Sequence, residues 1–127
     1  MENCAAFSTA APSSPYPHLA RAGFDVWIAE MRGHGLSPRN QGYRDNNVAQ
    51  YVRYDLPAIA DFIFEQTGQG AHWIGHSLGG VMALEALRSV PGRKVDRVVC
   101  LGSPLKGSFT ARHLAQHPAL CYTLGRS

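Results

Sequence analysis

The residues best suited to chemistry lie in one short stretch, Gly75-His76-Ser77-Leu78-Gly79, which forms a G-x-S-x-G pattern. In this pattern a buried strand ends, the backbone reverses sharply, and a helix begins with the serine at the apex. The apical serine takes a strained backbone conformation, so the residues two before and two after it must be small. Ser77 is therefore the candidate nucleophile, and the backbone N–H of Leu78 is the candidate oxyanion donor.

The sequence around this pattern supports the same turn. Residues 71–76 are short and apolar, as a buried strand should be, and the apolar residues after Ser77 recur with helical spacing. Gly75 and Gly79 supply the small neighbours, and Gly80 adds further room. The alternative is a glycine-rich turn with an idle serine, which does not explain the strand before it and the helix after it.

An α/β architecture must position this turn. Strands are predicted near residues 24–30, 71–76 and 95–101, and helices near 55–67 and 78–90. Alternating strands and helices form a parallel sheet through right-handed crossovers. The apolar residues of 24–30 are almost continuous, which predicts that helices cover the sheet on both faces.

The helix near 55–67 has clear end signals and one apolar stripe. Asp55 is predicted as its N-cap, and Gly68 as its left-handed stop. The stripe is widened by Phe62 and contains residues at i, i+3, i+4 and i+7, namely Leu56, Ile59, Ala60 and Ile63.

Length and composition limit the organisation of the chain to one domain. The chain has 127 residues and is 45% hydrophobic, which is ordinary for a globular protein. Residues 1–17 are rich in Ala, Ser and Pro and predict a disordered or extended lead-in, so the folded domain would cover 18–127. No run of 18 apolar residues predicts a transmembrane helix.

Cysteine usage and the N-terminus indicate a cytoplasmic protein. Cys4, Cys100 and Cys121 are odd in number and widely spaced, and no C-x-x-C pair suggests zinc or redox chemistry. The first residues lack the early positive charge of a signal peptide. Cys100 falls inside a predicted strand and is interpreted as a small core residue.

The basic charge is concentrated late in the sequence. Residues 86–127 contain seven Lys or Arg and one acid, for a charge of +6, whereas residues 1–85 contain five and eight, for −3. These basic residues are scattered, with no aromatic stacking platform, so a solvated surface is a better interpretation than a nucleic-acid site. No phosphate-binding glycine motif is present, which argues against a nucleotide-binding domain.

Several histidines could contribute to a site. His34 lies between Gly33 and Gly35 in a loop at the carboxyl end of the first predicted strand, where ligands bind in open α/β sheets. It could face the substrate, but a loop histidine bonding its own backbone is the preferred interpretation. His76, next to the candidate nucleophile, is also a possible substrate-side residue, with core or rim packing as the preferred interpretation. His113 and His117 are one helical turn apart, but without a third ligand they are interpreted as surface residues.

Four stretches together resemble the α/β-hydrolase superfamily, namely GFDVWIAEMRGHGLS, YDLPAIADFI, HWIGHSLGG and VVCLGSP. They run from about Leu19 to Pro104 and are most similar to serine esterases, lipases and aminopeptidase-like members, the middle two to acid lipases. The resemblance implies that Ser77 attacks an ester carbonyl and forms an acyl-enzyme that water hydrolyses. It implies a small ester or lipid-like substrate and no cofactor or metal; the oligomeric state is left open.

The chain departs from the family in its catalytic partners. The family order is Ser, then Asp or Glu, then His, and after Ser77 the only candidates are Glu85, Asp96, His113 and His117. Glu85 falls on the helix after the turn, and Asp96 at the amino end of the last strand. Family members also carry an early strand that ends in a His-Gly oxyanion loop and lies in the sheet between the strands matching 24–30 and 71–76. This strand and its loop are missing here. The alternative is therefore a truncated, inactive remnant or a binding module.

Overall fold

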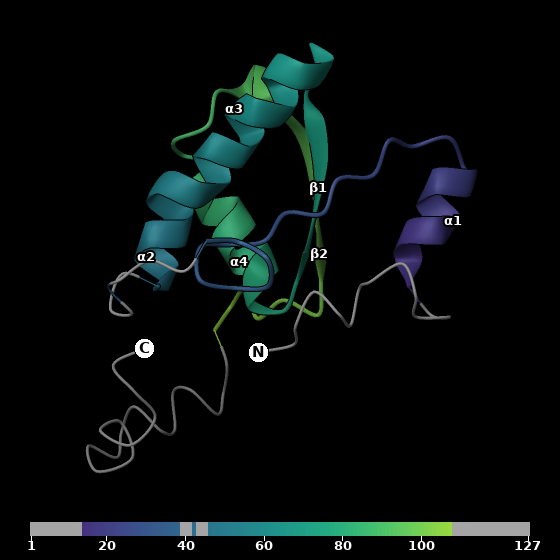
Figure 1. Cartoon of the computed structure of the whole chain (residues 1–127). Coiled ribbons are helices and arrows are strands. Elements are labelled where there is room, and N and C mark those ends of the chain that lie inside the picture. Colours follow the sequence, from purple (N-terminus) through teal and green to yellow (C-terminus); the bar gives the residue numbers. More distant parts are fainter. Residues whose placement is uncertain (1–13, 39–41, 43–45, 108–127) are drawn as a thin grey trace. The chain divides into compact units, whose positions relative to one another are not determined.

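The computed structural model describes residues 14–38, 42 and 46–107 (Figure 1). These residues belong to two compact units, Met1–Tyr43 and Arg44–Ser127. His113 and His117 lie outside the described residues, as do Cys4 and Cys121. Among the described residues, no helix combines the length and the hydrophobicity needed to cross a membrane.

The first helix of the described part of the first unit is α1, Pro15–Arg21. The side chain of Ser14 caps it by accepting the N–H of Tyr16, and Pro15 occupies the first turn, where its missing N–H costs nothing. The prediction of an extended or disordered lead-in through residue 17 is therefore wrong for residues 15–17, while residues 1–13 lie outside the description. Gly23 follows the helix with a φ of 92°, as expected of a glycine stop.

Residues 24–30 do not form the predicted strand. Their large apolar side chains are exposed, with Phe24 at 54%, Trp27 at 43% and Ile28 at 45%. A strand exists only where its backbone pairs with a second strand, and the described part of the first unit contains no second strand. Residues 24–30 therefore have the apolar sequence of a buried strand but make no strand pairing.

In the second unit a single helical run precedes the sheet. It consists of α2 (Val48–Gln50), the π-helical η3 (Tyr51–Asp55) and α3 (Leu56–Thr67). Pro57 has no N–H for the carbonyl of Arg53, and its ring would crowd that carbonyl in a regular helix. The backbone widens into a π turn at this point, and the Leu56 N–H bonds the carbonyl of Tyr51.

The predicted start of this helical run is wrong, and its predicted end is correct. Asp55 has helical dihedrals and makes no capping hydrogen bond, so its assignment as the N-cap was wrong. The helical run starts earlier, at Val48, and its N-cap is Asn47, whose Oδ1 accepts the Gln50 N–H at 3.0 Å. Gly68 ends α3 with a left-handed φ of 69°, as predicted.

The apolar stripe of α3 is narrower than expected. Leu56, Ala60 and Ile63 are buried, and Ile59 is half-buried. Phe62 is 53% exposed, so it does not widen the stripe. Leu56, Ala60 and Ile63 lie on one face of the helix. Phe62 is adjacent to Ile63 and therefore points about 100° away from it around the helix axis.

The two predicted strands of the second unit are present with their predicted bounds. They are β1 (Ala71–His76) and β2 (Val95–Leu101), and they pair in parallel with Trp73 opposite Val98 and Gly75 opposite Cys100. Helix α4 (Leu78–Ala86) and the 3₁₀ turn η4 (Gly92–Lys94) connect them. The structure thus contains a β–α–β unit centred on the G-x-S-x-G stretch.

Helix α4 is shorter than the predicted span of 78–90. Its last helical residue is Ala86, and residues up to Val90 continue as turns, with the Ser89 N–H bonding the Ala86 carbonyl at 2.9 Å. Pro91 disfavours helical backbone at Val90, so the helix could not have continued through the last predicted residue.

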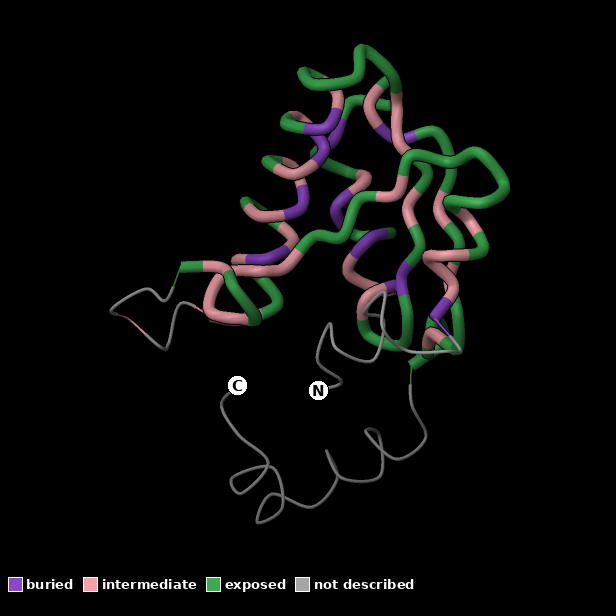
Figure 2. The backbone as a smooth tube through the Cα atoms, turned by 45° about the vertical axis from the view of Figure 1, so that its right-hand side comes forward, coloured by how far each residue is buried: buried purple, intermediate pink, exposed green. Residues whose placement is uncertain are grey.

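The core of the second unit lies on one face of the sheet. Figure 1 shows α3 and α4 on the same side of β1 and β2. Ala60, Val90 and Val95 are buried together, and partly buried hydrophobic side chains pack against them, namely Trp73, Leu87 and Val98. Figure 2 colours the backbone by burial, with buried residues in purple.

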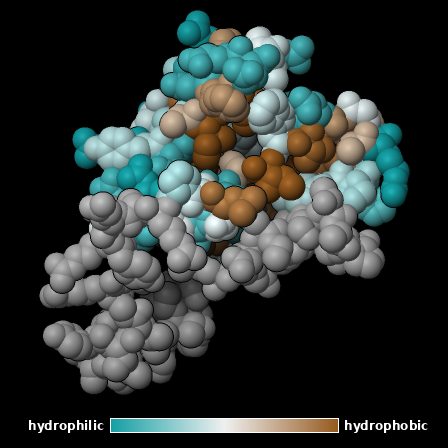
Figure 3. Space-filling view, viewed as in Figure 1, coloured by the Kyte–Doolittle hydropathy of each residue, from teal (hydrophilic) through white to brown (hydrophobic). Residues whose placement is uncertain are grey.

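Side chains on the other face of the sheet remain exposed. Ile74 is 49% exposed, Val99 46% and Leu101 42%. The space-filling view of Figure 3 shows hydrophobic residues, in brown, at the surface of the protein. Strand β1 alternates between the two faces, with Trp73 and Gly75 toward the core and Ile74 and His76 exposed. Within the described residues of this unit, the predicted covering of the sheet on both faces is therefore not found.

Candidate active site

Ser77 lies between the last residue of β1 and the first residue of α4. Its φ of 52° and ψ of −121° make it the one described non-glycine residue with a positive φ. Such a conformation costs about 1–3 kcal/mol and persists only where its surroundings enforce it. The predicted strained turn is confirmed, and Ser77 is exposed at its apex.

Gly75 lets the strand and the helix meet without a side chain between them. A Cβ on Gly75 would lie 2.5 Å from both the Cα and the N of Gly80, a distance that side-chain atoms do not tolerate against backbone. The Ser77 N–H donates to the Leu101 carbonyl at 2.9 Å, and the Gly80 N–H donates to the Ser77 carbonyl at 3.2 Å. The turn is thus held from β2 and from α4.

The two glycines after Ser77 have different surroundings. A Cβ on Gly79 would meet no other described atom within 4 Å, whereas a Cβ on Gly80 would overlap the side chain of Ser103. The residue crowded on the helix side is therefore Gly80, although the G-x-S-x-G pattern places its second glycine at Gly79. Sequence reasoning could not rank these adjacent glycines, because the crowding comes from Ser103, 23 residues away along the chain.

The start of α4 gives the site a positive electrostatic character. The first N–H groups of a helix have no partner within the helix, and Leu78 is the first residue of α4. The helix dipole adds about half a positive charge at this end. This end of α4 therefore favours a negative charge close to it.

Two carboxylates follow Ser77 in the described residues, and neither lies close to it. Glu85 pairs with Arg88 on the exposed side of α4 at 2.9 Å. Asp96 lies next to Val95, which pairs with Ala71 at the amino end of β1, whereas Ser77 follows the carboxyl end. At about 3.3 Å per residue, the strand separates these ends by roughly 20 Å. The predicted candidates Glu85 and Asp96 are therefore not brought to Ser77.

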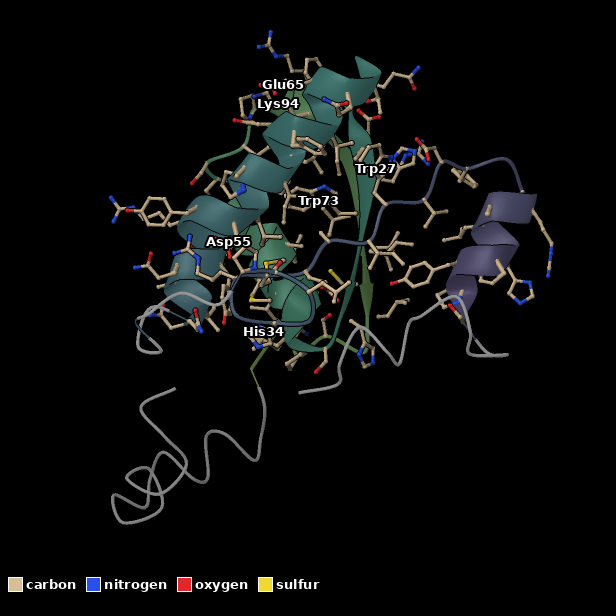
Figure 4. All side chains as sticks on the ribbon, viewed as in Figure 1. Trp27, His34, Asp55, Glu65, Trp73 and Lys94 are labelled. Carbon is tan, nitrogen blue, oxygen red and sulfur yellow. The ribbon has the colours of Figure 1, made fainter. Side chains whose placement is uncertain are left out.

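The two histidines predicted near the site lie in different units. His76 is the last residue of β1, opposite Leu101, and is exposed. His34 belongs to the first unit, where Figure 4 labels it in the loop after residue 30. Its Nδ1 lies 3.1 Å from the Arg32 carbonyl, which fits the preferred interpretation of a loop histidine bonding nearby backbone.

Glu30 organises this loop, a role that the sequence did not reveal. Its carboxylate accepts the Leu36 N–H, and its carbonyl accepts the hydroxyl of Ser37 at 2.8 Å. Gly35 has a φ of 54°, and a Cβ there would overlap the Glu30 carboxylate. A Gly-x-Gly spacing was the available signal, but it did not indicate which side chain the loop would close around.

No group of three His, Cys, Asp or Glu side chains in the described part of the chain could hold a metal ion. Cys100 is half-buried, with its Sγ 3.8 Å from the Gly80 carbonyl. It lies on β2 as predicted but is not among the buried core residues, so its predicted core role is not confirmed.

Residues 12–120 of the chain match the family described as alpha/beta hydrolase fold. The chain belongs to this family. The match includes the β–α–β unit and Ser77, and it extends on both sides of the described residues of the second unit.

The relatives of this hydrolase-family chain include lipases from animals and plants. It is 37% identical to gastric triacylglycerol lipase of Mus musculus over 102 residues, which are 72% of this chain and 26% of the relative. It is 38% identical to the Homo sapiens protein of the same name over 81 residues, 58% of this chain and 20% of the relative. It is 43% identical to triacylglycerol lipase 2 of Arabidopsis thaliana over 68 residues, 48% of this chain and 16% of the relative.

The chain thus spans about a quarter or less of the length of these curated relatives. No solved structure matches it significantly.

Proposed function

We propose that the chain carries the nucleophile of a serine hydrolase that acts on carboxylic esters. The observation behind this proposal is the backbone of Ser77, which has a φ of 52° at an exposed strand-to-helix turn. A strained, exposed serine at this position is the arrangement of a nucleophile elbow. A structural serine needs no such strain, because any small residue with helical dihedrals could begin α4 at less cost.

The proposed reaction is acyl transfer in two steps. The Ser77 Oγ attacks the ester carbonyl carbon, the bond to the alcohol oxygen breaks, and the alcohol leaves with a proton. Water then attacks the acyl-serine, which releases the carboxylic acid and restores the hydroxyl. The Leu78 N–H, at the start of α4, is proposed to stabilise the oxyanion that forms in each step.

The substrate class is proposed from the relatives. Several of them are named triacylglycerol lipases, so a lipid-like ester is the first substrate to test. The acyl-chain preference has no residue in the described units to support it. Cytoplasmic location also stays a prediction.

A second candidate function rests on the surroundings of Ser77. A serine hydroxyl is a weak nucleophile without a base, and neither Glu85 nor Asp96 lies beside Ser77. On this alternative, the chain is an inactive remnant or a binding module that keeps the turn. His113 and His117 lie outside the described residues and remain the candidates for the base within this chain.

A fluorophosphonate probe separates the two candidates. It forms a covalent bond with an activated serine, so mass spectrometry of the treated chain should locate the adduct on Ser77. The variant Ser77→Ala should not be labelled. Ser89→Ala is the matched control, because Ser89 is an exposed serine in the turn after α4, and this variant should be labelled like the natural chain.

Turnover of p-nitrophenyl butyrate provides the second measurement. Hydrolysis that is lost in Ser77→Ala and kept in Ser89→Ala supports a complete hydrolase within this chain. Labelling without turnover would support an activated serine that lacks part of the hydrolytic machinery. An unlabelled, correctly folded chain would contradict the hydrolase proposal and favour the inactive alternative.

A further inference from the structure

The end of β2 and the residues just after it contact the Ser77 turn at three successive backbone points. The Ser103 hydroxyl donates to the Gly75 carbonyl at 3.5 Å, before the apex. The Leu101 carbonyl accepts the Ser77 N–H at 2.9 Å, at the apex. The Cys100 thiol lies 3.8 Å from the Gly80 carbonyl, after the apex. The strained residue is therefore bracketed by contacts from one neighbouring segment.

Ser103 and Gly80 fit each other as a pair. A Cβ on Gly80 would overlap the Ser103 Oγ and would lie 2.9 Å from the Ser103 Cβ. The hydroxymethyl group of Ser103 thus occupies the space where any other residue at position 80 would place its side chain. Gly79 differs, because a Cβ there would meet no described atom within 4 Å.

We propose that Ser103 is a positioning residue for Ser77. Its side chain fills the gap over Gly80 and holds the Gly75 carbonyl, so that the strand and the helix flanking Ser77 keep one relative placement. This inference rests on the proposed function, in which Ser77 is the nucleophile. The contacts that carry this role are with the backbone of the turn, so Ser103 acts through Ser77 and not on a substrate.

Labelling rates with a fluorophosphonate probe test this role in four variants. Gly80→Ala forces its methyl against Ser103, and we expect labelling about tenfold slower than in the natural chain, because small misplacements of a nucleophile are costly. Ser103→Gly empties the gap, and we expect labelling about threefold slower. The double variant Gly80→Ala with Ser103→Gly should be labelled faster than Gly80→Ala alone, because the clash is gone.

Gly79→Ala is the matched control. It makes the same chemical change one residue away, in open space, and should be labelled like the natural chain. Rates are compared at a temperature where circular dichroism shows every variant to be folded, so that loss of fold does not imitate loss of positioning. Rescue in the double variant is the result that simple destabilisation does not produce, because two independent destabilising changes would add.

Amide hydrogen exchange tests the positioning without any activity. The Ser77 N–H, which bonds the Leu101 carbonyl, should exchange about tenfold faster in Gly80→Ala and recover in the double variant. If the natural chain is not labelled, the proposed function fails, and this measurement alone decides the role of Ser103. Equal behaviour of Gly79→Ala and Gly80→Ala, or a double variant no better than Gly80→Ala, would overturn the inference.

Discussion

Two apolar segments of similar length, each with one tryptophan, stand in different surroundings. In β1, Trp73 packs against the buried residues Ala60, Val90 and Val95. In residues 24–30, Trp27 is 43% exposed, and its indole N–H donates to the Asp25 carboxylate only two residues away, at 3.0 Å. Figure 4 labels both tryptophans. The contrast shows that an apolar segment becomes part of a core through its neighbours and not through its own composition.

The largest expected difference between the two segments is in amide hydrogen exchange. Amides of β1 that bond to β2 should exchange at least about a hundredfold more slowly than those of residues 24–30, because a ladder must open before it exchanges. Exchange followed by NMR or by mass spectrometry of short peptides measures this. Slow exchange at Val26 or Ile28 would break the comparison, since it would indicate a strand partner for that segment.

Substitution of each tryptophan compares the same change in both settings. Trp73→Ala should lower the free energy of unfolding of the second unit by about 3 kcal/mol, because it removes a large side chain from the core. Trp27→Ala should lower stability by less than about 1 kcal/mol, since it removes an exposed side chain and one local hydrogen bond. Urea unfolding of both variants checks the pair, and similar losses would contradict the burial difference.

A smaller effect should separate two neighbouring valines on β2. Val98 packs against the core, and Val99 is 46% exposed on the other face. Val98→Ser should cost about 2 kcal/mol, from lost burial and a poorly placed hydroxyl, whereas Val99→Ser should cost less than about 1 kcal/mol. Thermal unfolding of the two variants measures the difference. An equally costly Val99→Ser would mean that the exposed face of the sheet is covered in solution.

The smallest expected effect concerns an ion pair between elements. The Lys94 ammonium bonds the Asp61 carboxylate and so links η4 to α3, with 16% and 50% of the two side chains exposed. Asp61→Asn should lower the free energy of unfolding by no more than about 1 kcal/mol. The loss should shrink at high salt, because the Asp61 side chain is half exposed to solvent. Glu85→Gln, in the more exposed pair with Arg88, is the control and should cost less. A loss for Asp61→Asn that salt leaves unchanged would count against this explanation.

Two features predicted correctly from the sequence share one property. The stop at Gly68 and the strained backbone of Ser77 depend on residues close together in the chain. The bounds of β1 and β2 were also predicted, but each of these strands forms its ladder with the other. Glycine at a left-handed position and a serine between two small residues carry their own physical reason. Such local signals predict structure without knowledge of distant neighbours.

The predictions that failed depend on residues far away or on competing local effects. A ladder for residues 24–30 needs a second strand, and the exposure of Phe62 depends on which face of α3 meets the sheet. Asp55 could not act as an N-cap because the helix had already begun at Val48. The nucleophile role of Ser77 and the oxyanion role of Leu78 remain predictions, since neither Glu85 nor Asp96 lies beside the serine.

The open space over Gly79 has a practical consequence. A cysteine introduced there could carry a fluorophore or a spin label two residues from Ser77, because no described atom lies within 4 Å of its Cβ position. Such a reporter would follow the approach of a bound molecule to the turn. The same attachment at Gly80 would dislodge Ser103, so the two adjacent glycines divide into a position for observing the site and a position that must stay unaltered.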